Sequence, residues 1–286
     1  RVLSRLDGEI DVTYLRNGGV LQTVLRRVAA SGALDDDPLT SGAISADGLQ
    51  QVPPRRGGTP GVELAGLSAA WPGGAPVFAG LDAVAEPGRW LAVTGPSGSG
   101  KSTLLSVLLG FLPPAAGQAR VTGRAAWCPQ EAHLFDSTIR GNLLLGRPAG
   151  GQAASDGRQG DDELRAVLAA VGLSGLVERL PAGLDTRIGP GGAFLSGGER
   201  QRLAVARTLM TGAEVILLDE PTAHLDAEAA RAMLADLRMG LRTRTVVLVT
   251  HNPADVHAED ARLVLTARPG GEPGSAAPAY AAAGER

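Results

Sequence analysis

Cysteine, lysine, aromatic side chains and long apolar runs are all scarce in this sequence of 286 residues. The only cysteine, Cys128, has no partner for a disulfide within the chain, which is compatible with a cytosolic location. Aromatic residues make up only 3% of the chain, so the core has to be built from Ala, Val and Leu. No stretch approaches the roughly 18 apolar residues of a membrane-spanning helix, so a spanning part, if there is one, lies elsewhere.

Positive charge is carried almost entirely by arginine. The net charge is −3, so there is no basic field of the kind that indicates a nucleic-acid partner. Of the 27 Lys and Arg residues, Lys101 is the only lysine. A compact ammonium on a flexible stem differs chemically from a planar guanidinium, so its retention at one site predicts a chemical role rather than chance survival.

Alternating strands and helices predict an α/β fold with a largely parallel sheet, in one domain over residues 61–267. Residues 1–60 are expected to be an N-terminal extension and linker, residues 146–160 an exposed insertion, and residues 268–286 a disordered tail. Because the chain opens with Arg1, it is interpreted as part of a longer polypeptide. Strands are expected at 62–67, 77–84, 90–94, 215–218 and 245–250, a small β segment at 118–128, and helices at 102–109, 161–180, 196–210 and 227–239.

A glycine-rich loop follows the strand expected at 90–94 and opens the next helix. It matches the phosphate-binding loop pattern in full, with the residues Gly95, Pro96, Ser97, Gly98, Ser99, Gly100, Lys101 and Ser102. The glycines let backbone amides point at phosphate oxygens, and the helix N-terminus adds a favourable dipole. Lys101 is expected to reach the β- and γ-phosphates of ATP and Ser102 to bind Mg²⁺, with Thr103 completing the nucleotide-binding set. A Gly/Ser turn without a ligand is the alternative.

Two carboxylates follow the apolar run at 215–218. Asp219 is expected to hold Mg²⁺, and Glu220 to act as the general base that polarises the attacking water. Any strand that leads into an acidic turn has this pattern, so the assignment depends on the phosphate-binding loop upstream.

A third motif, Leu195-Ser196-Gly197-Gly198-Glu199-Arg200-Gln201, resembles the signature of ATP-binding-cassette (ABC) ATPases. The resemblance implies that Ser196, Gly197, Gly198 and Glu199 contact ATP held by a second cassette, as a homodimer or heterodimer. A plain helix cap is the alternative. Glu199 stands where many members of the family have Gln, and both occur.

Other elements of the same family follow in order, over about residues 61–267, and the resemblance implies a P-loop NTPase fold with a mostly parallel core sheet, a small antiparallel β subdomain and a helical subdomain. Trp71 resembles the aromatic residue that stacks on adenine, although a core or surface tryptophan is the alternative. Gln130 matches the glutamine that binds Mg²⁺ and communicates with the membrane domain. Asp226 lies in the segment matching the D-loop, and His251 matches the switch histidine that contacts the γ-phosphate.

The resemblance extends to exporters. Residues 133–142 are similar to the exporter sequence after this glutamine, which implies a membrane-domain partner, ATP hydrolysis coupled to transport, and a place at the cytoplasmic face of the membrane. Thr222-Ala223-His224-Leu225-Asp226 is similar to the D-loop of heterodimeric thiol-reductant exporters, which export glutathione or cysteine. Lipid, peptide and drug exporters remain open, as do a soluble ATPase of this superfamily and the ATPase subunit of an importer.

Overall fold

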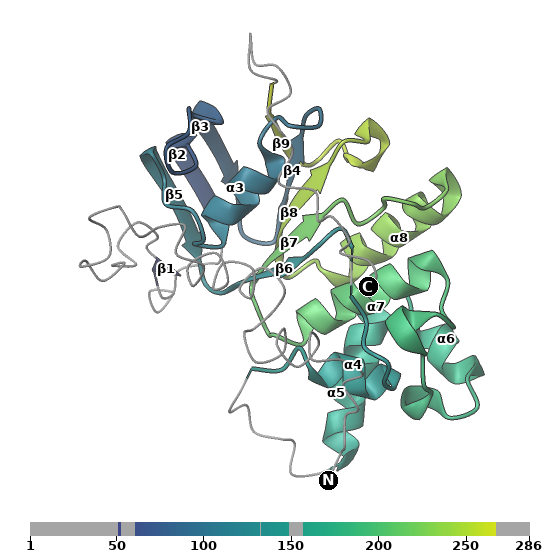
Figure 1. The fold of residues 1–286 in the computed structure, drawn as a ribbon. Helices are drawn as coiled ribbons and strands as arrows, with labels where there is room; N and C mark the ends of the chain where they lie inside the picture. The colour runs from purple at the N-terminus through teal and green to yellow at the C-terminus, as the bar shows by residue number, and fades with distance from the viewer. Residues whose placement is uncertain (1–50, 53–60, 132, 149–156, 267–286) are drawn as a thin grey trace, which may run out of the picture. The chain divides into compact units, whose positions relative to one another are not determined.

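A computed structural model describes residues 51–52, 61–131, 133–148 and 157–266. These residues form two compact units, each described here by itself (Figure 1). The sheet unit contains the described residues of 51–127, 214–220 and 243–266, and the helical unit those of 128–213 and 221–242. The expectations for the N-terminal extension and the C-terminal tail fall outside the described residues, apart from the two-residue strand β1.

A five-stranded sheet is the centre of the sheet unit. Its strand order is β6-β7-β8-β4-β9, and β4 pairs in parallel with β8 and β9, as does β7 with β8. β7 and β4 are buried in all but their last residue and β8 along its whole length, as expected of a parallel sheet covered on both faces. The strands are β4 (Trp90–Thr94), β6 (Ala125–Cys128), β7 (Val215–Asp219), β8 (Thr245–Thr250) and β9 (Ala261–Val264).

A smaller four-stranded sheet has the order β1-β5-β2-β3. β2 pairs antiparallel with both β3 and β5, and β1 runs parallel to β5. These strands are β1 (Gln51–Val52), β2 (Val62–Ala69), β3 (Phe78–Ala85) and β5 (Ala116–Thr122). The expected α/β class with a parallel sheet, a small antiparallel sheet and helices is confirmed.

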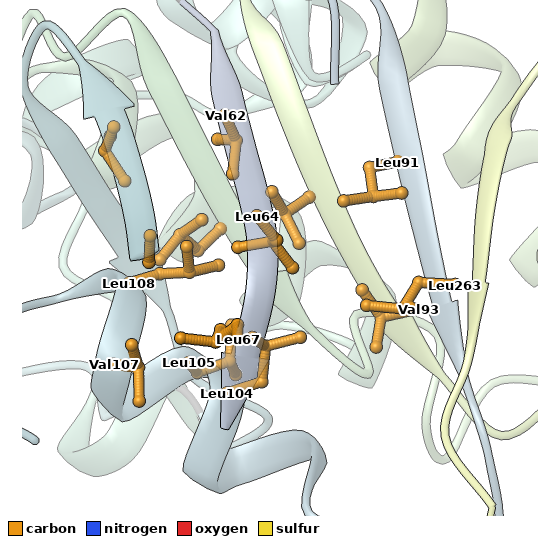
Figure 2. Close-up of a cluster of buried hydrophobic side chains, with 14 of the residues drawn as sticks. Val62, Leu64, Leu67, Leu91, Val93, Leu104, Leu105, Val107, Leu108 and Leu263 are labelled. Atoms are coloured by element: carbon orange, nitrogen blue, oxygen red, sulfur yellow. The ribbon is translucent and has the colours of Figure 1, made fainter. Parts of the chain in front are cut away.

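Aliphatic side chains fill the core of the sheet unit, as the shortage of aromatics predicted. Helix α3 (Lys101–Leu108) contributes Leu104, Leu105 and Leu108, which cluster with side chains of β2 and β4 (Figure 2). Leu67 of β2 and Val93 of β4 are fully buried in this cluster. The core therefore holds α3 firmly, and the start of α3 is the end of the phosphate-binding loop.

The helical unit is built from α4 (Ile139–Leu144), α5 (Gly157–Ala170), α6 (Ser174–Arg179), α7 (Gly197–Leu209) and α8 (Ala227–Gly240). Short 3-10 turns cover Gly183–Asp185 and Pro190–Gly192, and a further one in the sheet unit covers Pro253–Asp255. Arg140 of α4 forms ion pairs with Asp161 of α5 and with Asp185, at 2.8 Å for the latter. Hydrogen bonds from this guanidinium lower the pKa of both carboxyl groups and raise that of Arg140 itself.

Several sequence expectations were wrong in detail. The β segment expected at 118–128 is two strands in different sheets, because Gly123, at φ 89°, and Arg124 interrupt it. The insertion expected at 146–160 ends earlier, since α5 begins at Gly157. Helix α4 and strand β9 were not anticipated. Among the described residues no helix combines the length and apolarity needed to cross a membrane.

Candidate functional site

The phosphate-binding loop connects β4 to α3 in the sheet unit. Gly95, Gly98 and Gly100 all have positive φ, at 155°, 77° and 99°. A Cβ on Gly95 would lie 2.3 Å from a backbone oxygen, and one on Gly100 would lie 2.7 Å from Val77, whereas one on Gly98 would meet no atom of the described residues within 4 Å. The loop is thus packed tightly at both ends and open in the middle, as a cradle for a ligand requires.

The single lysine lies across this cradle. Lys101 is buried, and its Nζ donates to the carbonyl oxygens of Gly95 and Pro96 at 2.9 and 3.0 Å. Gly100, the residue that precedes α3, provides no side-chain cap. An ammonium and the amides of a helix N-terminus therefore face the same loop, and this combination binds anionic oxygens.

The carboxyl ends of three neighbouring parallel strands meet beside the loop. Asp219, the last residue of β7, pairs in register with Val249 of β8, and Thr94 of β4 pairs with Thr250 of β8. The pKa of Asp219 is raised to about 6, chiefly because the carboxyl group is buried, with a further contribution from the charge of Glu220. The Lys101 ammonium acts in the opposite direction. A buried carboxylate of this kind is a fitting ligand for a cation.

Glu220 and His251 form a pair at the same edge. Nδ1 of His251 lies 3.0 Å from Oε2 of Glu220, whose side chain is 16% exposed. Glu220 has φ 45°, a left-handed conformation that costs a non-glycine residue about 1–2 kcal/mol. Its backbone N–H donates to Val249 O at 2.9 Å, which holds the residue at the strand end. Strain of this kind is typical of functional sites.

A hydrogen-bond network fixes the turn after β8, and it was not predicted from the sequence. Thr250 Oγ1 donates to the buried Asp255 at 2.7 Å and accepts from the backbone N–H of Asn252 at 3.0 Å. The side-chain amide of Asn252 also donates to Asp255, at 3.2 Å. His251 lies within this turn, so the network determines where its backbone leaves the sheet. The Thr-His-Asn-Pro-Ala-Asp run was the only available signal.

Trp71 follows β2 in the sheet unit, and its side chain is exposed. Its indole N–H donates to Oγ1 of Thr103, in the first turn of α3, at 3.2 Å. The predicted adenine-stacking residue is therefore an exposed aromatic attached to the helix that carries the phosphate-binding loop. A tryptophan packed in the core is therefore excluded, and a surface tryptophan is the alternative that stays open.

The signature segment lies in the helical unit, at the start of α7. Ser196 caps this helix, since its Oγ accepts from the backbone N–H of Glu199 at 3.2 Å and Glu199 Oε2 accepts from the backbone N–H of Ser196 at 2.8 Å. A Cβ on Gly197 or Gly198 would make contacts no closer than 3.6 Å. Among the described residues no close contact requires glycine at these two positions, so the described part of the chain leaves the start of α7 open.

The remaining predicted residues also lie in the helical unit. Gln130 is exposed and follows β6, and the neighbouring carbonyl of Pro129 accepts from Gln201 of α7 at 3.4 Å. Asp226 caps α8 by accepting from the backbone N–H groups of Glu228 and Ala229 at 3.0 and 2.8 Å. The structure therefore brings Trp71, the loop, Asp219, Glu220 and His251 into one unit, and it places Gln130, the signature and Asp226 in the other.

The residues of the sheet unit fit a nucleotide with Mg²⁺. The exposed Ser102 follows Lys101 at the start of α3, and Asp219 supplies a buried carboxylate. Within the described residues there is no cluster of three or more His, Cys, Asp or Glu for a metal. Mg²⁺ does not require such a cluster, because it is commonly held by one or two protein oxygens together with substrate phosphates and water.

Comparison with known proteins agrees with this arrangement. Residues 78–223 match the family model described as ABC transporter. The mycobactin import ATP-binding/permease protein IrtB of Mycolicibacterium smegmatis is 39% identical over 203 residues, which are 66% of this chain and 34% of that protein. The ATP-dependent lipid A-core flippase of Chromobacterium violaceum is 32% identical over 77% of this chain and 38% of its own length.

A solved structure is also similar to this chain. A bacterial Atm1-family ABC exporter with ATP bound matches with a TM-score of 0.60 and 29% identity, over 73% of this chain and 38% of that one. The chain thus spans little more than a third of the length of the relatives that it matches.

Proposed function

Because the chain belongs to the ABC transporter family, whose ATP-binding domains hydrolyse ATP, we propose that it is the nucleotide-binding domain that powers a membrane exporter. The observation that carries the proposal is the meeting of Lys101, Asp219, Glu220 and His251 at the carboxyl ends of β4, β7 and β8. Ligands of open α/β sheets bind outside the carboxyl ends of the strands, which is where these side chains lie.

The sheet unit would bind the nucleotide from base to phosphate. The exposed ring of Trp71 offers a stacking surface for the purine. The loop from Gly95 to Gly100 surrounds the phosphates with amides, and Lys101 exchanges its two carbonyl partners for phosphate oxygens. Thr103, in the first turn of α3, is also among the residues that would bind the nucleotide.

Hydrolysis would depend on the pair at the strand ends. Glu220 orients the attacking water and accepts its proton, and His251 holds the Glu220 carboxylate and contacts the γ-phosphate. Ser102, Asp219 and Gln130 would hold Mg²⁺, which when bound neutralises charge on the phosphates. The positive φ of Glu220 supports this role, because strained backbone conformations of non-glycine residues are concentrated at functional sites.

A second cassette would complete each site. Ser196, Gly197 and Gly198 leave the start of α7 open, which suits the γ-phosphate of ATP bound to the partner, and Glu199 fixes the cap. Asp226 would contribute from the cap of α8. Two ATP molecules are then sandwiched between two cassettes, and closure drives the attached membrane domains at the cytoplasmic face of the membrane.

Export is favoured over import by the sequence of residues 133–142, by one relative and by the similar solved structure. One relative is named as a flippase and the similar structure as an exporter, whereas IrtB is named for import. An importer ATPase therefore remains the second candidate, and a soluble ATPase the third. For the cargo we propose a thiol compound such as glutathione or cysteine, which is supported only by the segment Thr222–Asp226.

ATP hydrolysis by the purified chain, measured over a range of protein concentrations, tests the ATPase. We expect the rate per molecule to rise with concentration as cassettes pair. A flat, near-zero rate with ATP still bound indicates an obligate different partner, and a chain that binds no ATP refutes the proposal.

Transport needs the complete protein with its partner, in sealed inverted vesicles. We expect ATP-dependent accumulation of radiolabelled glutathione or cysteine, which the Glu220→Gln variant abolishes. Accumulation of a lipid or siderophore instead would reject the thiol cargo but keep the exporter. ATP-driven loss of preloaded cargo from the same vesicles would favour import.

A further inference from the structure

The hydrogen bond from Trp71 to Thr103 links the proposed purine platform to the phosphate-binding helix. The indole Nε1–H donates to Thr103 Oγ1 at 3.2 Å, while 46% of the Trp71 residue surface is exposed and only 7% of that of Thr103. We propose that Thr103 is a positioning residue that holds the Trp71 ring in the orientation in which it stacks on the purine. The inference rests on the proposed function and extends it to recognition of the base.

An exposed aromatic side chain normally samples several rotamers, and a ligand that stacks on it has to immobilise it. Ordering a side chain of this kind costs part of the free energy of binding. Thr103 is nearly buried in the first turn of α3, which the core holds in place, so a bond to it fixes the ring before ATP arrives. Phenylalanine cannot make this bond, because the indole N–H is its donor.

The backbone around Trp71 is restrained as well. The Trp71 carbonyl accepts from the backbone N–H of Gly74 at 2.9 Å, and Ala69 O accepts from Val77 N at 2.7 Å. Val77 then lies against the N-terminus of α3, where a Cβ on Gly100 would be only 2.7 Å from it. The segment that bears Trp71 is therefore attached to the start of α3 both through its backbone and through the ring.

This attachment sets the position of the base platform relative to the phosphate cradle. Thr103 is two residues beyond Lys101, so the ring is fixed to the same helical turn that presents the ammonium. The hydroxyl that accepts from the indole keeps its own O–H as a donor. We therefore expect the protein to bind ATP more tightly than the triphosphate chain alone.

The test compares Thr103→Val, which keeps the shape and removes the acceptor, with Thr103→Ser, which keeps the hydroxyl. Dissociation constants are measured by calorimetry for ATP and for tripolyphosphate. In the Val variant the affinity for ATP should fall about threefold to tenfold more than the affinity for tripolyphosphate does, which is the range expected for one lost hydrogen bond. The Ser variant should keep the wild-type ratio of the two affinities.

Trp71→Phe supplies a second route, since it keeps an aromatic ring and removes the donor. It should weaken ATP but not tripolyphosphate binding, and adding Thr103→Val to it should cause no further loss. An equal loss for both ligands in the Val variant would show that Thr103 acts on phosphate and would overturn the inference, as would unchanged ATP binding or full additivity. If the wild-type protein binds ATP no more tightly than tripolyphosphate, the inference is overturned, while the assignment of the phosphate site is retained. If the wild-type protein binds neither ATP nor tripolyphosphate, both the inference and the proposed function are refuted.

Discussion

Replacing Glu220 by Gln should nearly abolish ATP hydrolysis and leave ATP binding intact. Glutamine has the same shape, and its amide oxygen can still lie beside His251 Nδ1, which is 3.0 Å from Glu220 Oε2, so the site geometry is retained. What is lost is the ability to accept a proton. A positioned general base contributes about 10²- to 10⁴-fold, or roughly 3–5 kcal/mol of the activation barrier.

The assay is steady-state phosphate release at saturating ATP, with the partner half present if the chain alone is inactive. Glu214→Gln is a matched control, because Glu214 precedes β7 at the opposite end and its carboxylate accepts from Arg124 N at 2.8 Å, a bond that glutamine can also accept. The control should hydrolyse ATP like wild type. Hydrolysis by the Glu220 variant within threefold of the control would refute the assignment of the general base.

Three further predictions concern the residues that surround this pair. Because the pKa of Asp219 is raised to about 6, its protonated form dominates below that pH and should add a loss of up to about tenfold per pH unit to Mg²⁺-dependent ATP binding; a terminal phosphate titrates in the same range, so calorimetry from pH 5 to 8 should show a steeper slope in wild type than in Asp219→Asn, and equal slopes would contradict the role of Asp219. Gly95→Ala should lower the melting temperature more than Gly98→Ala, since only the former places its Cβ against a backbone oxygen, and equal melting temperatures would contradict the packing described. Thr250→Val removes the hydroxyl that donates to the buried Asp255 at 2.7 Å, so in denaturant titrations it should lower the free energy of unfolding by about 1–3 kcal/mol. Thr250→Ser keeps the hydroxyl and should have a free energy of unfolding close to that of wild type.

The buried strands could be predicted from sequence almost to the residue. β4 and β8 have the expected bounds, because a short unbroken apolar run flanked by polar residues is typical of a strand buried on both faces of a parallel sheet. The helices that begin at a capping residue were also anticipated closely, with Ser196 before α7 and Asp226 before α8. These features depend on neighbours within a few positions.

Pairing between distant segments could not be read in the same way. The stretch from Ala116 to Cys128 contains strands of two different sheets, and only their partners decide which strand joins which. β9 is four residues long and only partly buried, so it lacks a strong apolar run of its own. α4 has six residues and depends on the Thr138 cap and on the ion pairs of Arg140.

The sequence by itself determined the chemistry of this protein: a loop that can wrap phosphate, one lysine, two carboxylates after a buried strand, and the order of the family motifs. Tertiary structure alone decided that His251 contacts Glu220, that Asp219 is buried enough to titrate near pH 6, and that Trp71 is bonded to Thr103. Motifs are local in sequence and arise from residue type and spacing. A contact between residues 31 or 32 positions apart, and the burial that shifts a pKa, exist only after the strands have paired and the core has closed.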